Sequence, residues 1–544
     1  QRRQKTKRYS VMKSVMQKDW QAPNVSLQRS KFNRSHGHKT TLDADLLVPL
    51  CCDEVLPGDT VNMSMSAFCR LSTPIYPIMD NQLMTVHWFF VPLRLIWDNS
   101  ENFFGEDLVG GDGNAPVKPL RTTNAVAGAS ENTLEDYFGI PTLVPGLTYD
   151  ELPLRGYYEI YNQWYRDQNL QELIPIDKGD LPNDWTGVDP QNPTDPTPIL
   201  KRNKRHDYFT SSLPWPQKSF NDISIPILDP SRQDEWTTEA LETETLYNTG
   251  DGSPNGWFIP EGGTPYSGFT NNVTGGSWFV PNHQAWNEMS GTINQLRTSF
   301  AIQRYFERSA RGGSRYPEVL KAHFGVTSPD ARLQRPEYLG RNTATINVTP
   351  VASTFEQDAE TRTVGDLGAM GTVSMNGQRS FVKSFVEHGY LYAIASVTAD
   401  LTYQQGLHRM WRRDNRFQYF WPEFAGVGEQ AVSTQEIYAG DLGGVTPLDT
   451  TFGYQERYAE YRYAPSRISG QFRSYIQTPL DAWHLSQEFT QAPLLNDNFI
   501  RSNTPMGRVL AVPSEPHFIC DFYFQTTWAR PMPLYGIPGN IDRF

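Results

Sequence analysis

Cysteine is scarce in this sequence. The 544 residues include only Cys51, Cys52, Cys69 and Cys520, and no two of them form a C-x-x-C pair. Tetrahedral zinc sites and disulfide-stabilised secreted domains use more cysteines, at closer and more regular spacing. The sequence therefore predicts free thiols in a reducing compartment, and no structural metal.

Long apolar runs are also missing. The most apolar stretch, residues 86–97, is interrupted by Pro92 and Arg94 and is too short to span a bilayer. The first 20 residues are basic and polar, without the apolar segment of a secretory signal. We therefore expect no membrane insertion.

Recognisable catalytic motifs are absent as well. The sequence has no phosphate-binding loop, dinucleotide-binding glycine motif, zinc-protease motif or nucleophilic-serine elbow. His36 and His38 could offer two imidazoles to a metal, but further ligands are missing and a polar turn is favoured. Asp481 and His484 suggest part of a catalytic triad, but no serine motif accompanies them and a structural histidine is favoured. We predict a protein that is not an enzyme and needs no cofactor.

Glycine, proline and aromatic residues are plentiful. The chain has 41 Gly and 40 Pro, and 13% of its residues are Phe, Trp or Tyr. This composition is typical of many short strands joined by turn-rich loops. Residues 61–67 alternate apolar and polar side chains as a half-buried strand does, residues 85–92 suit a strand buried on both faces, and residues 517–528 suit a long strand.

Two segments have features of helices. Ser290 or Thr292 could cap a helix that ends at residues 312–313, two glycines, with its apolar side chains on one face. Residues 401–411 are a second candidate, although Gly406 weakens it. No repeat of fixed period is present, which disfavours solenoids and propellers.

Basic residues are concentrated at the start of the chain. Residues 1–40 contain eleven lysines and arginines against one acid, Asp19, a balance of +10 in a chain of net charge −12, so the other residues sum to −22. Such a segment is expected to be mobile alone and to become ordered on a polyanion. A solvated tail is the alternative. The side chains predicted to bind phosphates are Arg2, Arg3, Lys5, Lys7, Arg8, Lys13 and Lys18.

Residues 221–290 have the opposite charge. They contain ten acids against one base, Arg232, together with 14 glycines and prolines. Two similar units, at 257–260 and 278–281, indicate short strands or turns in a surface insertion. Their aromatic side chains either hold the loop together, which we favour, or contact a partner. The candidate contact residues are Trp257, Phe258, Tyr266, Phe269, Trp278 and Phe279.

Long motifs occur in order along nearly the whole chain. They lie at residues 35–41, 47–49, 53–59, 73–81, 89–92, 97–99, 204–217, 323–340, 399–406, 452–462, 481–485 and 529–539. In these segments the chain resembles the major capsid protein of gokushoviruses, within the microvirus family. The resemblance does not extend to residues 221–290, where no shared sequence motif is found.

The resemblance implies an all-β fold, an eight-stranded antiparallel jelly roll or viral β-barrel with large inserted loops and a few helices. It also implies a homo-oligomer, a small icosahedral shell of the T=1 type around the circular single-stranded DNA of a bacteriophage. Assembly would occur in the host bacterial cytoplasm, together with a small DNA-binding protein and a pilot protein of the virion. The insertion would form a protrusion at the threefold axes that meets a host cell-surface receptor.

The expected organisation has four parts. Residues 1–40 form a basic arm inside the shell, 41–220 the first part of the jelly-roll body, 221–290 the acidic surface insertion, and 291–544 the rest of the body with the C-terminal strand. Two other function classes stay open. A glycosidase would need a pair of acids in a cleft, and a carbohydrate- or receptor-binding spike would not need the basic arm.

Overall fold

The computed structural model describes residues 28–104, 116–190, 192–218, 255–258, 266–270, 293–312, 318, 321–323, 335–352, 367–440 and 449–535. The chain divides into two compact units, residues 1–216 with 329–544 and residues 217–328. The larger unit contains the two main sheets. Each unit is described by itself.

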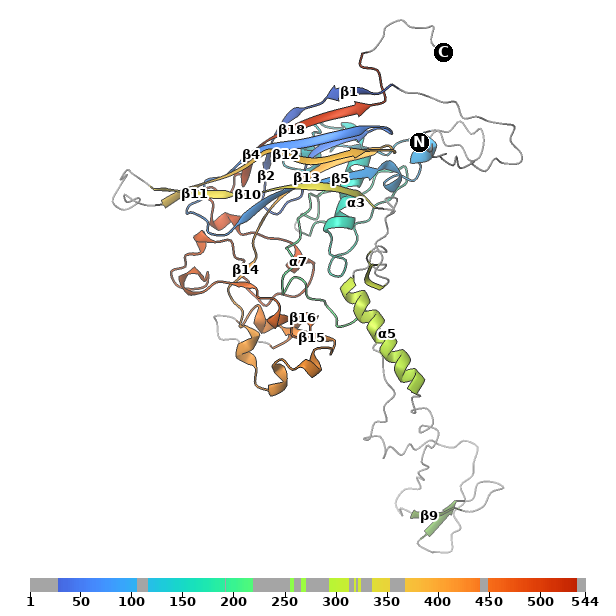
Figure 1. Ribbon diagram of the computed structural model, residues 1–544, viewed down its shortest axis with the longest axis vertical. Coiled ribbons are helices and arrows are strands. Elements are labelled where there is room, and N and C mark those ends of the chain that lie inside the picture. The colour runs from blue at the N-terminus through green and yellow to red at the C-terminus, as the bar shows by residue number, and fades with distance from the viewer. Residues whose placement is uncertain are drawn as a thin grey trace, which may run out of the picture. The chain divides into compact units, whose positions relative to one another are not determined.

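Six antiparallel strands form the first main sheet (Figure 1). Their order is β1-β18-β4-β12-β11, and β2 also pairs with β18. Because the strands alternate between buried and exposed residues, one face of the sheet lies in a core and the other does not. The strands are β1 (Ser30–Asn33), β2 (His36–Leu42), β4 (Thr60–Leu71), β11 (Asn347–Ala352), β12 (Leu367–Ser384) and β18 (Phe518–Arg530).

Four antiparallel strands form the second main sheet. Their order is β10-β5-β13-β3. The two central strands, β5 and β13, are buried along almost their whole length, as expected for strands covered on both faces. The strands are β3 (Val48–Val55), β5 (Gln82–Pro92), β10 (Glu337–Thr345) and β13 (Gly389–Ala399).

The largest core lies between the two main sheets. Trp88 of β5 packs edge-on against Phe524 of β18, with ring centroids 5.8 Å apart, and Phe381 of β12 lies 5.6 Å from the same tryptophan. The indole N–H of Trp88 donates to Asn342 of β10 at 2.8 Å. Bulky apolar side chains from both sheets therefore hold the body together, and the polar edge of the indole is satisfied.

A second core covers the far face of the four-stranded sheet. The helix α3 (Leu152–Ile160), which continues as a π-helical turn (Tyr161–Tyr165), packs there with the buried Trp97 and Trp185. The Tyr392 hydroxyl of β13 donates to the Pro153 carbonyl at 3.0 Å. A β-carbon at Gly156 would lie only 2.0 Å from that hydroxyl, so this close approach requires glycine.

The remaining elements of the larger unit are short. Three small two-stranded sheets are β6 (Leu120–Thr122) with β7 (Thr148–Asp150), β14 (Thr402–Tyr403) with β17 (Ser466–Arg467), and β15 (Glu429–Ser433) with β16 (Thr451–Glu456). Short helices are α1 (Ser100–Phe103), α2 (Leu134–Tyr137) and α7 (Asp497–Ile500). Turns of 3-10 helix are Leu93–Leu95, Arg409–Arg412, Arg416–Gln418, Pro422–Phe424, Thr434–Glu436, Ala459–Tyr461, Gly470–Phe472, Asp481–Trp483 and Met506–Arg508.

The smaller unit contains one long helix, α5 (Ile293–Gly312), and a hairpin of β8 (Asn255–Phe258) and β9 (Tyr266–Thr270). The helix predicted to end at the glycine pair is confirmed, since α5 ends at Gly312. Its proposed caps, Ser290 and Thr292, lie outside the described residues.

Most of the expected strands are confirmed, and two local predictions are wrong. The runs at 61–67, 85–92 and 517–528 lie in β4, β5 and β18. The helix predicted at 401–411 is absent: a short strand, β14, and a 3-10 turn occupy the segment, because Gln405 and Leu407 form backbone hydrogen bonds with Ala439 and Gln435. The turn expected at residues 36–38 is part of strand β2.

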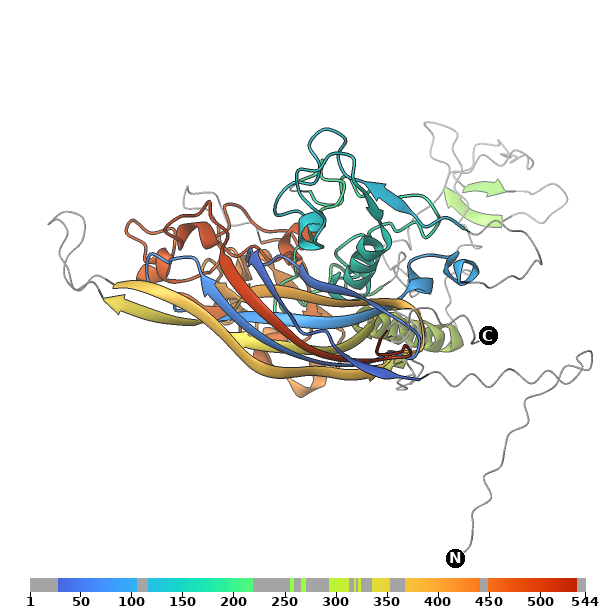
Figure 2. The ribbon, with the colours of Figure 1, turned by 90° about the horizontal axis from the view of Figure 1, so that it is seen from above.

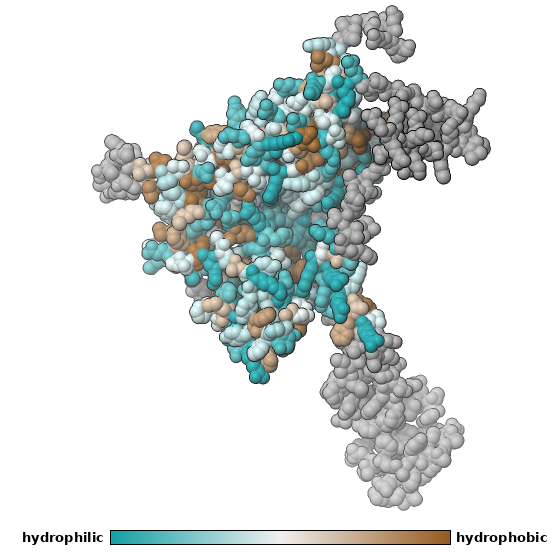
Figure 3. All heavy atoms as spheres, viewed as in Figure 1, coloured by the Kyte–Doolittle hydropathy of each residue, from teal (hydrophilic) through white to brown (hydrophobic). Residues whose placement is uncertain are grey.

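Antiparallel sheet dominates the described chain and helices are few, as predicted for the fold class. All four cysteines are free thiols, and Cys69 and Cys520 are buried. On the face drawn in Figure 3, hydrophobic residues form small separate groups among hydrophilic ones. None of the described helices is both long and apolar enough to cross a membrane.

Candidate nucleic-acid interface

The two main sheets differ in what covers their outer faces. The four-stranded sheet packs against α3 and the loops of residues 93–200, and these segments and residues 449–517 lie on one side of the strands (Figure 2). The outward side chains of the six-stranded sheet are exposed instead. We call this surface of β1, β2, β4, β12 and β18 the open face.

Strand register places unlike side chains next to each other on the open face. Lys39 of β2, Asp521 of β18, Phe68 of β4 and Ser374 of β12 form one row across the sheet. The neighbouring row contains Thr41, Ile519, Arg70 and Thr372, and a third row contains Tyr523 opposite Ser66. Charged, hydroxyl-bearing and apolar side chains are therefore mixed over the sheet.

Several large side chains of the open face are exposed to solvent. Phe68 is 47% exposed, Ile519 59% and Tyr523 50%. The Arg70 guanidinium lies 5.6 Å from the centre of the Phe68 ring, within the range of a cation–π contact. Flat aromatic rings exposed on a sheet are suited to stacking on other flat groups.

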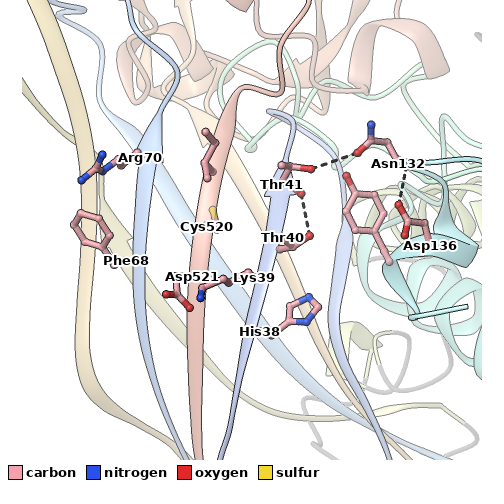
Figure 4. Close-up of a pocket in the computed structure, with 12 residues that line it drawn as sticks. His38, Lys39, Thr40, Thr41, Phe68, Arg70, Asn132, Asp136, Cys520 and Asp521 are labelled. Carbon is pink, nitrogen blue, oxygen red and sulfur yellow. Dashed lines mark hydrogen bonds between the residues drawn. The ribbon is translucent and has the colours of Figure 1, made fainter. Parts of the chain in front are cut away.

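A shallow depression of about 730 Å³ occupies one end of the open face (Figure 4). Its floor and one side come from β2, β4 and β18, and its far rim from Asn132 and from Asp136 and Tyr137 of α2. Asn132 accepts a hydrogen bond from the Thr41 hydroxyl at 3.3 Å, and its backbone N–H donates to the Asp136 carboxylate at 2.9 Å. The rim is therefore fixed to the edge strand.

The charge of the open face is positive. Its exposed strand residues include four cations, Lys31, Lys39, Arg70 and Arg379, against one carboxylate, Asp521. Burial lowers the pKa of His38 in β2, with a smaller contribution from His36, so His38 adds no charge near neutral pH. Cations combined with exposed aromatic rings are the side chains that bind single-stranded nucleic acid: the cations contact phosphates and the rings stack on bases.

The segment predicted to be a mobile basic arm, residues 1–40, belongs in part to the six-stranded sheet, since β1 (Ser30–Asn33) and most of β2 (His36–Leu42) lie within it. The described chain begins at residue 28, just before β1, which pairs with β18 at the edge of the six-stranded sheet. Residues 1–27, which contain Arg2, Arg3, Lys5, Lys7, Arg8, Lys13 and Lys18, lie outside the described residues. Their role as phosphate ligands stays a prediction.

Comparison with known proteins identifies the family. A family of phage capsid proteins, described as capsid protein (F protein), matches residues 21–540. The chain belongs to this capsid protein family. Capsid protein VP1 of Chlamydia phage 1 is 42% identical over 97% of this chain and 98% of that protein. The VP1 proteins of Bdellovibrio phage phiMH2K and Spiroplasma virus 4 are 43% and 32% identical, over 96% and 94% of this chain.

Membership in the capsid family settles three of the predictions. The resemblance to gokushovirus capsid proteins is confirmed, and the chain is a structural component of a phage virion. Capsid proteins of this family are not enzymes, so the glycosidase alternative is excluded. Among the residues with described positions, no group of three or more His, Cys, Asp or Glu side chains is arranged to hold a metal ion.

The predicted contact residues of the insertion lie partly on the hairpin of the smaller unit. Trp257 and Phe258 are in β8, and Tyr266 and Phe269 are in β9, with Phe258 paired to Tyr266. Only the backbone of these strands is described. Trp278 and Phe279 lie outside the described residues. The suggestion that these six residues contact a receptor therefore stays a prediction.

The histidines considered as chemical sites are held by local contacts. His484 Nε2 lies 2.5 Å from the Phe472 carbonyl oxygen, and its Nδ1 accepts from the backbone N–H of Ser486 at 3.2 Å. These contacts support the structural interpretation of His484. His36 packs against Phe524, with ring centroids 5.3 Å apart.

The open face is the site that the sequence pattern did not predict. In β4 the outward positions run Asn62, Ser64, Ser66 and then Phe68. Phe68, an aromatic residue among the otherwise polar outward positions of this strand, was the one feature that could have indicated the open face. In β18 both phases are partly apolar, so the sequence did not show which residues face outwards.

Proposed function

We propose that this capsid protein assembles into a small icosahedral shell of the T=1 type around a circular single-stranded DNA genome. The observation that carries the proposal is the capsid family match over residues 21–540. The basic, aromatic open face supports it, because a shell subunit needs one surface that tolerates nucleic acid. Assembly in the bacterial cytoplasm with a small DNA-binding protein and a pilot protein completes the proposal.

The strand order supports a jelly roll as the body of the subunit. Within the two sheets, β2-β18-β4-β12 and β3-β13-β5-β10 form two groups of four. The first and last of these eight strands are neighbours, as are the fourth and seventh. Two facing four-stranded sheets with such connections describe a jelly roll. On this assignment β1 and β11 are additions to one sheet, and the insertions lie in loops.

The open face and the basic arm face the interior in our proposal. Lys39 and Arg70 would meet phosphates, and Phe68 and Tyr523 would stack on unpaired bases, together with Tyr9 and Trp20 of the arm. The contacts would discriminate little between sequences, since every base has a flat face. The open face and the arm would then form one continuous surface for DNA.

The acidic insertion faces outwards in our proposal. Residues 221–290 carry ten acids and one base, a charge that repels DNA. They would form the protrusion at the threefold axes and meet a host receptor. Receptor binding, which was the alternative function of a spike protein, would then be a second activity of the same coat protein.

Electron microscopy of the protein expressed with the other virion proteins tests the proposal, with nuclease-protected DNA assayed on the same fraction. We expect uniform icosahedral particles that protect single-stranded DNA. Subunits that stay unassembled under all these conditions would refute it.

A further inference from the structure

Residues 411–463 contain a second set of exposed aromatic side chains, outside the strands of the open face. Phe420 lies 6.4 Å from Tyr461, and the Arg413 guanidinium lies over both Tyr461 and Tyr419. Trp411 is 70% exposed, and six other aromatic residues are each about half exposed. We call this set the aromatic patch: Trp411, Phe417, Tyr419, Phe420, Trp421, Tyr461 and Tyr463. Single exposed apolar residues are ordinary, but a group of this size marks a contact site.

The aromatic patch is held in place by local contacts. The Trp421 indole N–H donates to the Arg416 carbonyl at 2.9 Å, and Phe420 lies 5.1 Å from the Tyr458 ring. The guanidinium of Arg413 lies 4.6 Å from the centre of Tyr461 and 5.2 Å from that of Tyr419. Side chains already fixed in the free protein lose little entropy when a partner binds.

The charges around the aromatic patch are balanced. Residues 409–467 contain seven arginines, no lysine and eight acids. Four of the seven arginines form ion pairs: Arg409 with Glu436, Arg412 with Asp449, Arg413 with Glu460 and Arg462 with Glu456. A neutral surface does not attract a polyanion, whereas exposed Trp, Tyr and paired Arg are typical of the centres of protein interfaces.

We propose that the aromatic patch is a contact between subunits, and that its partner is a second copy of this chain. The inference rests on the proposed shell, in which identical subunits meet repeatedly under closed symmetry. Seven half-exposed aromatic side chains offer on the order of 700 Å², at ~100 Å² each. This area is close to the ~800 Å² that each partner contributes to a stable interface.

Trp411→Glu tests this contact, with Leu173→Glu as its matched control. Both side chains are largely exposed, at 70% and 61%, so neither change should disturb the folded subunit. A carboxylate buried without a partner opposes association, so Trp411→Glu should reduce the yield of sedimenting shells about ten-fold. Leu173→Glu should leave the yield unchanged. Circular dichroism of the unassembled subunit checks its fold.

Hydroxyl-radical footprinting of intact wild-type particles provides the second readout. We expect Trp411 and Trp421 to be protected in particles, before and after the DNA is removed, and reactive in dissociated subunits. Equal reactivity of the rings in particles and in dissociated subunits would overturn the inference. Protection that is lost when the DNA is removed, or a normal yield of shells from Trp411→Glu, would overturn it as well. Failure of the wild-type chain to form shells would refute the proposed function instead.

Discussion

At the scale of single residues, a buried ion pair lies at the start of α3, between the N-cap residue Glu151 and Arg155. Arg155 and Glu151 have fully buried side chains, and the guanidinium donates to the carboxylate at 2.8 Å. Arg155 also donates to the carbonyls of Ile96, Gly179 and Leu181. The arginine thus satisfies several groups that have no access to water.

Arg155→Ala should lower the free energy of unfolding by roughly 3 kcal/mol. Glu151 would lose the nearer of its two ion-pair partners, keeping Arg121 at 3.5 Å, and three carbonyls would lose their donor. Urea denaturation of the unassembled subunit measures the change. Arg205→Ala is the matched control: its ion pair with Asp400 is about 40% exposed on both sides, so a loss of at most about 1 kcal/mol is expected. Equal losses in the two variants would contradict this account.

His87 makes the subunit sensitive to acid. Burial, with smaller effects of Arg202 and Arg341, lowers the pKa of His87 to about 3, and its Nδ1 lies 2.7 Å from the Tyr165 hydroxyl. Below pH 6.5 the unfolded chain binds a proton at this residue that the folded chain does not bind. Stability is therefore lost as the pH falls from about 6.5 towards 3.

His87→Gln should flatten this acid dependence. The His87 contribution falls by about 1.4 kcal/mol for each pH unit below 6.5, or roughly 2 kcal/mol by pH 5. Denaturation midpoints of both proteins between pH 8 and pH 5 measure it. The two curves should run parallel above pH 7 and approach each other below pH 6; parallel curves throughout would show that another group is responsible.

At the scale of elements, the strands with a clear sequence pattern were predictable. The elements that form only because of contacts with the rest of the fold were not. β4 shows strict alternation, and β18 is a long apolar run closed by Pro531. β13 was missed: like β5 it is buried on both faces and has no period, and its alanines make it a less dense apolar-aromatic run than β5. α3 was missed because it is short and depends on contacts such as the hydrogen bond from Tyr157 to the Leu47 carbonyl.

The segment 401–411 shows why a helical pattern can be overridden. A β-carbon at Gly406 would lie 2.0 Å from the Glu436 carbonyl oxygen. The segment therefore passes too close to residues 435–439 for any residue other than glycine at position 406. Backbone hydrogen bonds with Gln435 and Ala439 replace those of a helix. Sequence alone contains no information on this approach.

Gly406→Ala should therefore destabilise the subunit by about 1–3 kcal/mol, the usual cost of overpacking. Gly426→Ala is the control, because nothing lies within 4 Å of the position of its β-carbon. Thermal unfolding compares the two variants. An unchanged melting temperature for Gly406→Ala would show that the segment around residue 406 can move away from Glu436 at no cost in stability.

At the scale of the whole molecule, charge separates the chain into a basic start and an acidic remainder, and β1, at the end of the basic part, is a strand of the sheet that carries the open face. The composition and the motifs predicted the coat-protein class and the mainly β fold. They could not predict the open face, because burial of one sheet and exposure of the other depend on where residues 93–200 fold back.

Removal of residues 1–18 should weaken DNA retention more than shell closure. Seven of the cations lie there, and each lost phosphate contact reduces the salt dependence of binding. Particle yield and protected DNA, measured over a range of salt concentrations, separate the two effects. A truncated particle with full DNA content and unchanged salt sensitivity would refute the role of the arm.

Ultraviolet cross-linking of DNA to protein inside intact particles tests the central claim most directly, with the linked peptides identified by mass spectrometry. The account predicts cross-links on the arm and on the open-face strands that contain Phe68 and Tyr523, and none on the aromatic patch. Cross-links confined to other surfaces, with the open face unlinked in DNA-filled particles, would contradict it.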